Sequence, residues 1–245
     1  MPRQARQLSD SGYLHLILRG IGKQILFEDR EDREFFLSAL CRFCRETEVA
    51  LCAYCLMENH VHLLVNDPKG HTALLMKKLG VSYARHFNGK YDRCGHLFQD
   101  RYLSEAIEDD GYLLAVFRYI LRNPQKAGIC PAAEYEWSSF PAYDDGDSFV
   151  DTSLLRELIG GREAYLVFLS SDSEESCMEY EPVRRDDDWA KETMKKLLGV
   201  SSGTALQQMD RADRSAALKA LKGAGLTVRQ IERLTGINRN VVQKA

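Results

Sequence analysis

The stretch VALCAYCLMENHVHLLV, residues 49–65, decides the fold of this chain. Residues 49–57 are almost continuously apolar, which predicts a buried β-strand. Residues 58–59, Glu-Asn, make a tight connection, and residues 60–65 form a second strand. Two strands joined by so short a turn predict a β-hairpin.

Further strands and helices are expected on both sides of this hairpin. In order, the expected elements are a strand at 13–19, a helix at 30–47, the hairpin, a helix at 74–87, a strand within 95–107 and a helix at 109–123 that Pro124 stops. This order predicts an α+β domain, in which an antiparallel sheet carries helices on one face.

The charge is divided unevenly along the chain. Residues 146–188 carry 4 Lys and Arg against 12 Asp and Glu, whereas residues 189–245 carry 11 against 4. We therefore expect an acidic linker at 144–188 and a separate basic, helical module at 189–245 that favours nucleic acid. Residues 69–101 hold a local charge of +5, which suits either a phosphate backbone or a solvated helix face.

The composition is that of a soluble globular protein, 44% hydrophobic and 28% charged. No apolar run approaches the roughly 18 residues that a membrane span needs. The basic N-terminus is not followed by an apolar segment, so it does not resemble a secretory signal. We expect a cytoplasmic, nucleoid-associated protein without a membrane partner.

Four cysteines invite a zinc interpretation. Cys41 and Cys44 form one C-x-x-C pair, and Cys52 and Cys55 form another. The gap between the pairs is shorter than in usual zinc sites, and in a strand positions three apart face opposite sides. Small buried hydrophobic residues are the alternative that we favour.

His60 and His62 are the first candidates for chemistry. Residues two apart in a strand share a face, so two neutral imidazoles can form half of a metal site. Tyr119 and Asn123 are four apart on the expected helix and can approach the same ion. The alternatives are unrelated polar residues on the strand, a core-edge tyrosine and a polar residue at a helix end.

Three ordered motifs together resemble the single-tyrosine HUH transposases, and within them the IS200-like branch called REP-associated tyrosine transposases. The motifs are LMENHVHLLV at 56–65, GHLFQDR at 95–101 and RYILRNP at 118–124 followed by KAG at 126–128, supported by Tyr13-x-His15, Arg19-Gly20, Phe27 and Tyr135-x-Trp137-Ser-Ser139. The resemblance covers about residues 1–143.

This resemblance implies a ferredoxin-like sheet and a tyrosine that attacks a DNA phosphate and stays joined to the 5′ end. By position, the tyrosine is Tyr119 and the ligands of Mg²⁺ or Mn²⁺ are His60 and His62. Related enzymes often have Gln four residues after the tyrosine, whereas this chain has Asn123, as the REP-associated branch commonly does.

Several cations near these motifs are candidates for phosphate contacts. Arg101 and Lys126 are the chosen residues, while Arg118 and Arg122 also suit solvated helix charges. Base stacking is open to Tyr102 and Phe98, although core packing suits Phe98 better.

The end of the chain, about residues 226–245, resembles a helix-turn-helix of the replication-initiator or sigma-factor kind. Thr227 is the expected N-cap and Gly236 the turn, while Ile231, Leu234, Ile237, Val241 and Val242 are expected to pack inward. The DNA contacts would come from Arg229, Asn238, Arg239, Asn240, Gln243 and Lys244. A small packing bundle is the alternative.

Together these features predict a metal-dependent endonuclease and strand transferase of transposase type. Its partners would be single-stranded or hairpin DNA, with duplex DNA on the C-terminal module, and it would act as a monomer or homodimer. One alternative is a DNA-binding regulator with an inactive nuclease domain. Another is a histidine phosphohydrolase acting on nucleotides, which lacks a third histidine at the required spacing after His62.

Overall fold

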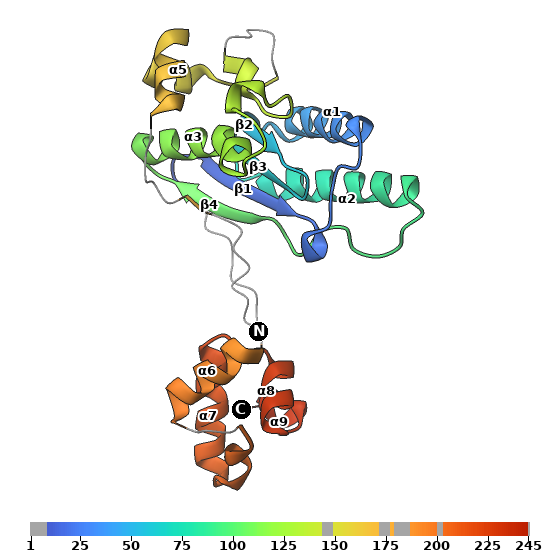
Figure 1. Ribbon diagram of the computed structural model, residues 1–245, viewed down its shortest axis with the longest axis vertical. Helices are drawn as coiled ribbons and strands as arrows, with labels where there is room; N and C mark the ends of the chain where they lie inside the picture. The colour runs from blue at the N-terminus through green and yellow to red at the C-terminus, as the bar shows by residue number, and fades with distance from the viewer. Residues whose placement is uncertain (1–8, 144–148, 172–176, 179–186, 200–202, 245) are drawn as a thin grey trace. The chain divides into compact units, whose positions relative to one another are not determined.

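The computed structural model describes residues 9–143, 149–171, 177–178, 187–199 and 203–244. The chain divides into two compact units, Met1–Tyr180 and Glu181–Ala245 (Figure 1). Within the described residues, none of the helices has the length and apolar character that a membrane crossing requires.

A four-stranded antiparallel sheet forms the centre of the first unit. Its strands are β1 (Tyr13–Arg19), β2 (Ala50–Leu56), β3 (His60–Asn66) and β4 (Leu103–Ile107). The strand order is β2-β3-β1-β4, so the first strand of the chain lies between β3 and β4. The expected α+β class and the ferredoxin-like antiparallel sheet are confirmed.

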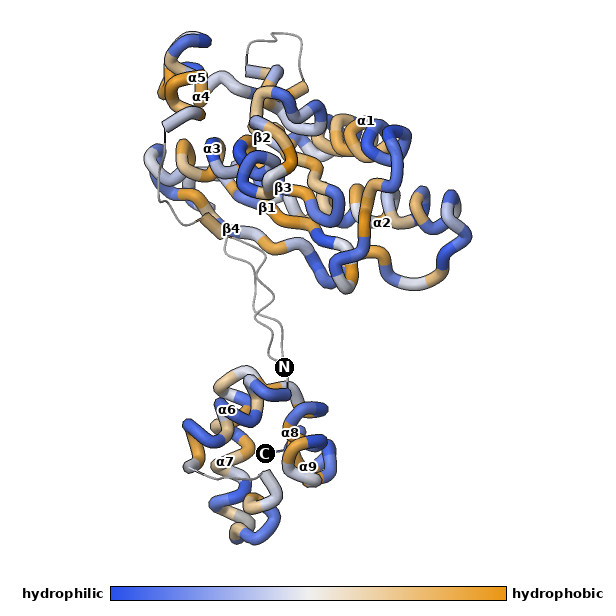
Figure 2. Tube along the Cα trace, viewed as in Figure 1, coloured by the Kyte–Doolittle hydropathy of each residue, from blue (hydrophilic) through white to orange (hydrophobic). Residues whose placement is uncertain are grey.

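Helices α1 (Arg30–Thr47) and α2 (Thr72–Lys90) cover one face of the sheet and lie side by side (Figure 1). Alternate residues of β1, such as Leu14 and Leu16, join these helices in one apolar cluster. The strands are mostly hydrophobic along the chain trace, as buried strands require (Figure 2).

Helix α3 (Asp110–Lys126) covers the opposite face, so the expectation that helices lie on one face is wrong for this helix. Its apolar residues pack with Ala53 and Cys55 of β2 and Leu64 of β3. The physical reason is that both faces of β2 and β3 are buried and both need a cover. Pro124 does not stop α3, because a proline in the last turn costs only one hydrogen bond before the helix ends.

Much of the segment expected as a linker at 144–188 is folded onto the first unit. It holds α4 (Ser153–Ile159) and α5 (Arg162–Ser170). Elsewhere in the first unit lie the short turns η1 (Ile21–Lys23), η2 (Ala132–Glu134) and η3 (Phe140–Tyr143). Tyr165 of α5 is buried and stacks on Tyr143 with ring centroids 3.9 Å apart. Residues 144–148, 172–176 and 179–186 of the expected linker lie outside the described residues.

The cysteines of the zinc interpretation do not gather at one place: Cys41 is half-buried, and the other three divide between two clusters. Cys44 packs with α1 and α2, whereas Cys52 and Cys55 both pack toward α3. A register shift between Leu51 and Ala53 places these two on one side, contrary to the simple alternation expected. The described residues contain no group of three or more His, Cys, Asp or Glu side chains that could hold a metal ion.

The second unit is helical. Its elements are α6 (Asp187–Leu198), η4 (Gly203–Gln208), α7 (Arg211–Gly223), α8 (Val228–Thr235) and α9 (Arg239–Lys244). Thr227 and Gln230 form a capping box at the start of α8. Gly236 ends α8 with a φ of 70°, a conformation that glycine adopts without strain.

The packing of this unit agrees with the sequence pattern except at one position. Ile231, Ile237 and Val242 are buried. Val241 is 47% exposed, because in so short a helix only one of two adjacent residues faces inward.

A buried carboxylate ties α1 to α2. The carboxylate of Asp32 accepts hydrogen bonds from Tyr91 at 2.7 Å, Lys90 at 3.1 Å and His86 at 3.2 Å. Burial by itself would raise the pKa of Asp32, but these hydrogen bonds hold it below its ordinary value.

We predict that Asp32→Ala lowers the free energy of unfolding at pH 7 by about 2 kcal/mol, since it removes the acceptor of the half-buried Tyr91 hydroxyl and His86 imidazole. Because the folded pKa is depressed, the wild type should lose this stability as the pH falls below about 4, and the variant should lack that loss. Urea unfolding of both proteins at pH 7 and below about pH 4 measures the free energy of unfolding under each condition. Glu34→Ala, at an exposed position on the same helix, is the control, and equal effects of both variants would contradict the prediction.

Candidate active site

Two histidines of β3 face α3. Val61, between them, packs toward α1 and α2, so His60 and His62 point to the opposite side of the sheet. Their ring centroids lie 4.9 Å apart. His62 is 1% exposed and His60 is half-buried, so the pair leads from the interior to the surface.

Tyr119 of α3 lies against this pair. Its ring centroid is 5.4 Å from that of His62 and 6.0 Å from that of His15. The ammonium of Lys126, seven residues further along α3, lies 4.5 Å from the centroid of the Tyr119 ring. A phenol, three imidazoles and one cation therefore meet at one place between the sheet and α3.

Asn123 completes this arrangement from the next turn of α3. Its side chain lies close enough to His60 to oppose the lowering of that imidazole's pKa by burial, and its amide nitrogen donates to the Tyr119 carbonyl at 3.4 Å. The structure thus brings together Tyr119, His60, His62, Asn123 and Lys126, all of which the sequence selected.

The sequence interpretation missed a buried chain of polar groups behind His62. His15 Nε2 lies 3.1 Å from His62 Nδ1, and His15 Nδ1 lies 3.9 Å from a Glu105 oxygen. Tyr112 donates to the same carboxylate at 2.8 Å. The sequence signal for His15 was a histidine within a largely apolar strand. The structure buries this histidine fully.

One set of tautomers is consistent with these positions, in which His15 Nδ1 faces Glu105 at 3.9 Å but makes no hydrogen bond to a described residue. If His15 Nδ1 carries its proton toward Glu105, then His15 Nε2 accepts from a protonated His62 Nδ1. The Nε2 lone pair of His62 is then left for a ligand. For His60, Nδ1 lies 2.7 Å from the Asn59 oxygen and so acts as a donor, which leaves its Nε2 lone pair as well.

The environment keeps these imidazoles neutral. Burial lowers the pKa of His60 to about 4, with a further contribution from the Arg19 guanidinium and an opposing one from the Asn123 side chain. Burial also holds the pKa of His62 well below its ordinary value, and that of His15 below it. Neutral imidazoles are the form that binds metal ions. Arg19 lies opposite His60 in the β1–β3 pairing and is a second residue that the sequence interpretation missed.

The remaining candidates lie elsewhere. Arg101 is exposed and lines a cavity on the α2 side of the sheet. Arg118 donates to Ser171 Oγ at 2.9 Å and Arg122 to the Ser171 carbonyl at 2.8 Å, so both anchor the end of α5. In the second unit, exposed positions are occupied by Arg229, Asn238, Arg239, Asn240, Gln243 and Lys244.

A comparison with known protein families covers the residues of this site. Residues 9–123, which include β1 to β4 and most of α3, match the family model of IS200-like transposases. Over this segment the chain is similar to the IS200-like transposase family. The match includes both histidines, Tyr119 and Asn123.

Several solved structures are similar to part of this chain. One is the REP-associated tyrosine transposase bound to a REP hairpin, which is 17% identical and has a TM-score of 0.50, covering 62% of this chain and 96% of its own. Another is a proposed transposase from Deinococcus radiodurans R1, 19% identical with a TM-score of 0.35, covering 48% of this chain and 95% of its own. Among curated proteins, none matches the chain.

We predict that His15 sets the tautomer of His62. In His15→Leu, His62 loses its acceptor, so its preference for a proton on Nδ1 should disappear, at a cost of about 1–3 kcal/mol in unfolding free energy. His15→Gln supplies an amide oxygen and should restore the preference. Nitrogen-15 NMR of the imidazoles reports the tautomer. The same His62 tautomer in all three proteins would show that His15 has no such effect.

Proposed function

We propose that this protein is an IS200-like transposase, a metal-dependent endonuclease and strand transferase for single-stranded DNA, with Tyr119 as the nucleophile. The observation that carries the proposal is the position of the Tyr119 ring, 5.4 Å from the His62 ring and 4.5 Å from the Lys126 ammonium. A phenol between neutral imidazoles and a cation suits attack on a negatively charged phosphodiester.

In the proposed step, the Tyr119 oxygen forms a bond to phosphorus as the bond to the 3′ oxygen breaks. The phenol proton leaves to solvent, and the 3′ oxygen departs as a hydroxyl. The product is a phosphotyrosine at the 5′ end of the cut strand. Because the bond energy is conserved, a 3′ hydroxyl can reverse the step on the same or another strand without ATP.

The residues present fit a divalent metal in part. His60 and His62 offer neutral Nε2 lone pairs, and the Asn123 amide lies beside His60. Mg²⁺ or Mn²⁺ bound there would offset the charge of the phosphate oxygens and orient the phosphate. With two imidazoles and one amide, the site leaves room for phosphate and water ligands.

Three other residues support the site without touching the scissile bond. His15 and Glu105 hold the His62 ring with its Nε2 outward. Lys126, at the rim, is placed to contact a phosphate near Tyr119.

Hairpin DNA is the proposed substrate class. The structural neighbour of the same fold is described as bound to a REP hairpin, and this chain resembles the REP-associated branch in its motifs. An inactive regulator would bind the same DNA without forming an adduct, and a nucleotide phosphohydrolase would release small products without one.

We expect Tyr119→Phe to abolish cleavage and the covalent adduct, while DNA affinity changes less than about threefold because only one hydroxyl is removed. The assay incubates labelled hairpin DNA with Mn²⁺ and protein, and mass spectrometry maps the nucleotide-linked tyrosine. Tyr54→Phe is the matched control, because Tyr54 lies on the other face of the sheet.

Omitting the metal, or changing His60 to Ala, should also prevent adduct formation. An adduct on another tyrosine would refute the assignment of Tyr119. An adduct that forms at wild-type rate in His60→Ala over a metal titration would refute the metal site.

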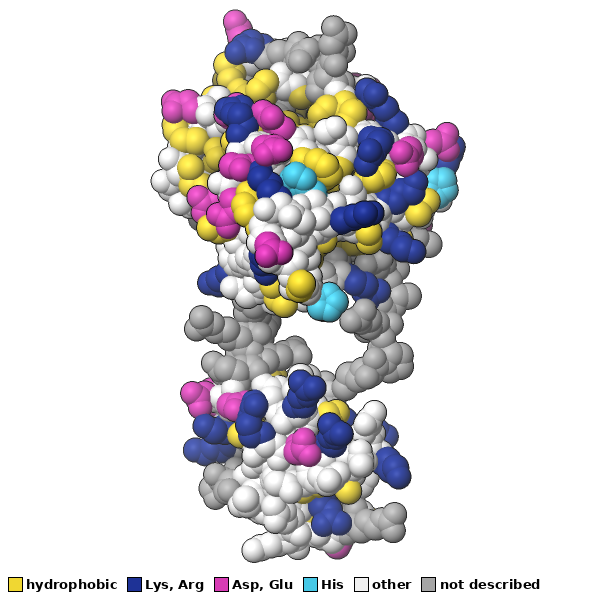
Figure 3. Space-filling model, turned by 90° about the vertical axis from the view of Figure 1, so that its right-hand side faces the viewer, with side chains coloured by type: hydrophobic (Ala, Val, Ile, Leu, Met, Phe, Trp, Pro, Cys, Tyr) yellow, Lys and Arg dark blue, Asp and Glu magenta, His cyan; other side chains and the backbone are white. Residues whose placement is uncertain are grey.

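We also propose that the second unit binds duplex DNA through α9 and the turn before it. Residues 189–245 carry a net charge of +7, and Lys and Arg side chains predominate on the visible face of this unit (Figure 3). Arg239, Asn240 and Gln243 are exposed on one short helix, where base and phosphate contacts need them.

Removing residues 181–245 should weaken duplex binding and flatten its dependence on salt, because fewer phosphates are contacted. Arg239→Ala should reduce the salt slope by about one, whereas Lys196→Ala, an exposed residue of α6, should change it less. Binding titrations at two salt concentrations give the slopes. Equal affinities and slopes for the full and shortened chains would show that this unit does not hold DNA.

A further inference from the structure

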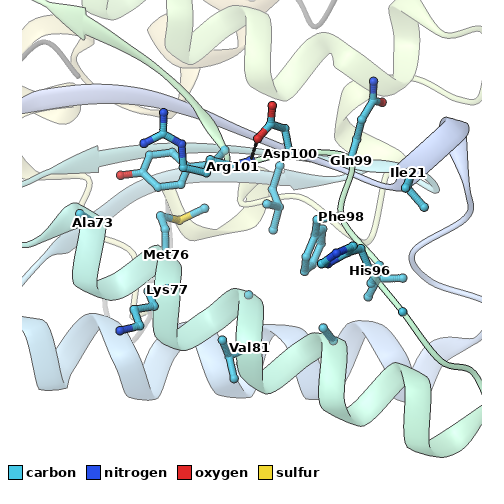
Figure 4. Close-up of a pocket in the computed structure, with 16 residues that line it drawn as sticks. Ile21, Ala73, Met76, Lys77, Val81, His96, Phe98, Gln99, Asp100 and Arg101 are labelled. Atoms are coloured by element: carbon cyan, nitrogen blue, oxygen red, sulfur yellow. Dashed lines mark hydrogen bonds between the residues drawn. The ribbon is translucent and has the colours of Figure 1, made fainter. Parts of the chain in front are cut away.

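A cavity of about 680 Å³ lies on the face of the sheet opposite the histidines. It is bounded by α2 and by residues 95–102, which lead into β4. Figure 4 shows Phe98 and His96 on this segment, with Met76 pointing toward them from α2. The function proposed above assigns nothing to this cavity.

The wall formed by residues 97–99 is fixed to the end of β1. The Leu97 carbonyl accepts from Ile21 at 2.9 Å, and the Gln99 amide donates to the Arg19 carbonyl at 2.9 Å. Phe98 forms a β-bridge with Gly20, and its ring lies 6.4 Å from that of buried Tyr83. The aromatic wall is therefore held in place without a ligand.

The opposite wall is open because of a glycine in α2. A Cβ atom at Gly80 would lie in van der Waals contact with the Phe98 ring, at 3.9 Å, so a larger side chain there would fill the space beside that ring. Met76, Ala84 and Leu18 supply an apolar floor. A flat ring can enter such a space and stack on Phe98.

Cations stand at the rim of the cavity. The side chains of Lys77 and Arg101 are exposed and form no ion pair among the described residues, whereas the neighbouring Lys78 is bound to Glu46 at 2.6 Å. Asp100 also lines the cavity, and its carboxylate accepts from the Arg101 amide at 2.8 Å. An apolar slot with an aromatic wall and two uncommitted cations matches a base with its flanking phosphates.

The cavity and the candidate active site share a strand. Leu18 lines the cavity, and the next residue, Arg19, lies opposite His60 on the other face. Gln99 and Asp100 point away from α2 (Figure 4).

We propose that this cavity binds one or two unpaired bases of the single-stranded DNA that flanks the cleaved phosphate. Phe98 stacks on a base, and Lys77 and Arg101 contact the adjoining phosphates. This inference rests on the proposed function for its ligand, single-stranded DNA. It adds a second site that anchors the strand away from Tyr119.

The test fills the cavity. In Gly80→Leu the new side chain occupies the space above Phe98, whereas Gly89→Leu places the same side chain on α2 with nothing within 4 Å. Fluorescence anisotropy measures full-length protein binding to a DNA hairpin with a short single-stranded extension and to the same hairpin without it. Thermal unfolding shows that both variants fold.

Gly80→Leu should weaken binding of the extended hairpin by about tenfold or more, with no effect on the blunt hairpin, and Gly89→Leu should change neither. An extension of abasic sites should bind the wild type as weakly as the natural extension binds Gly80→Leu. A folded Gly80→Leu protein that keeps wild-type affinity for the extended hairpin would overturn the proposal. If Gly80→Leu perturbs folding, Lys77→Ala with Arg101→Ala replaces it, and an unchanged affinity of that double variant for the extended hairpin would overturn the proposal equally.

The covalent adduct separates this inference from the proposed function. At saturating DNA, Gly80→Leu should still form the Tyr119 adduct, because the cavity binds the strand and not the scissile bond. The wild type could form no adduct while the Gly80→Leu substitution still weakens binding of the extended hairpin. In that case the cavity assignment stands and the nuclease proposal fails.

Discussion

The pairing of β1 with β3 is the constraint on which the rest of this molecule depends. It sets Ile17 opposite His62 and Arg19 opposite His60, and so brings His15 within hydrogen-bond range of His62. Side chains alternate along a strand, so a slip of one residue would move His15 to the face covered by α1 and α2. The apolar residues Leu14, Leu16 and Leu18 oppose that slip, because they would leave their cluster for the polar site. The packing of an ordinary hydrophobic face thereby fixes the geometry of three histidines.

At this site the buried polar groups are neutral, and the charged side chains lie at its edge. The imidazoles near Tyr119 are neutral because burial lowers their pKa values, most fully for His62. The cations, Arg19 and Lys126, stand at the borders of that group. Such a division suits a ligand that carries its own negative charge, because the interior then provides lone pairs and the rim provides the compensating charge.

Local patterns in the sequence predicted most of the elements. Strand β1 and helix α1 agree with their expected bounds, since their apolar spacing and their end residues are local features. The His60–His62 face also followed from alternation alone. The order of the strands and the contact between His15 and His62 did not, because they depend on pairing between residues 47 positions apart.

Two further errors have the same origin in distant contacts. The bulge near Cys52 reversed the expected direction of one side chain. The segment around α4 and α5 was interpreted as a linker because it is acidic, although Leu155, Tyr165 and Leu169 are buried against α3. Net charge describes the solvent side of such helices and gives no information on the few residues that face inward.

The anchoring of α5 has a consequence for how this protein can be divided. Arg118 and Arg122 project from the helix that carries Tyr119, and both bind oxygen atoms at the end of α5. Phe117, directly before Arg118, packs on Tyr165 and Phe168. A fragment cut after residue 143 would expose to water the back of the helix that carries Tyr119, even though all the motifs that resemble the family would be retained. The smallest piece of this protein that folds by itself is therefore longer than those motifs, and fusion or exchange of the C-terminal unit is best tolerated beyond α5.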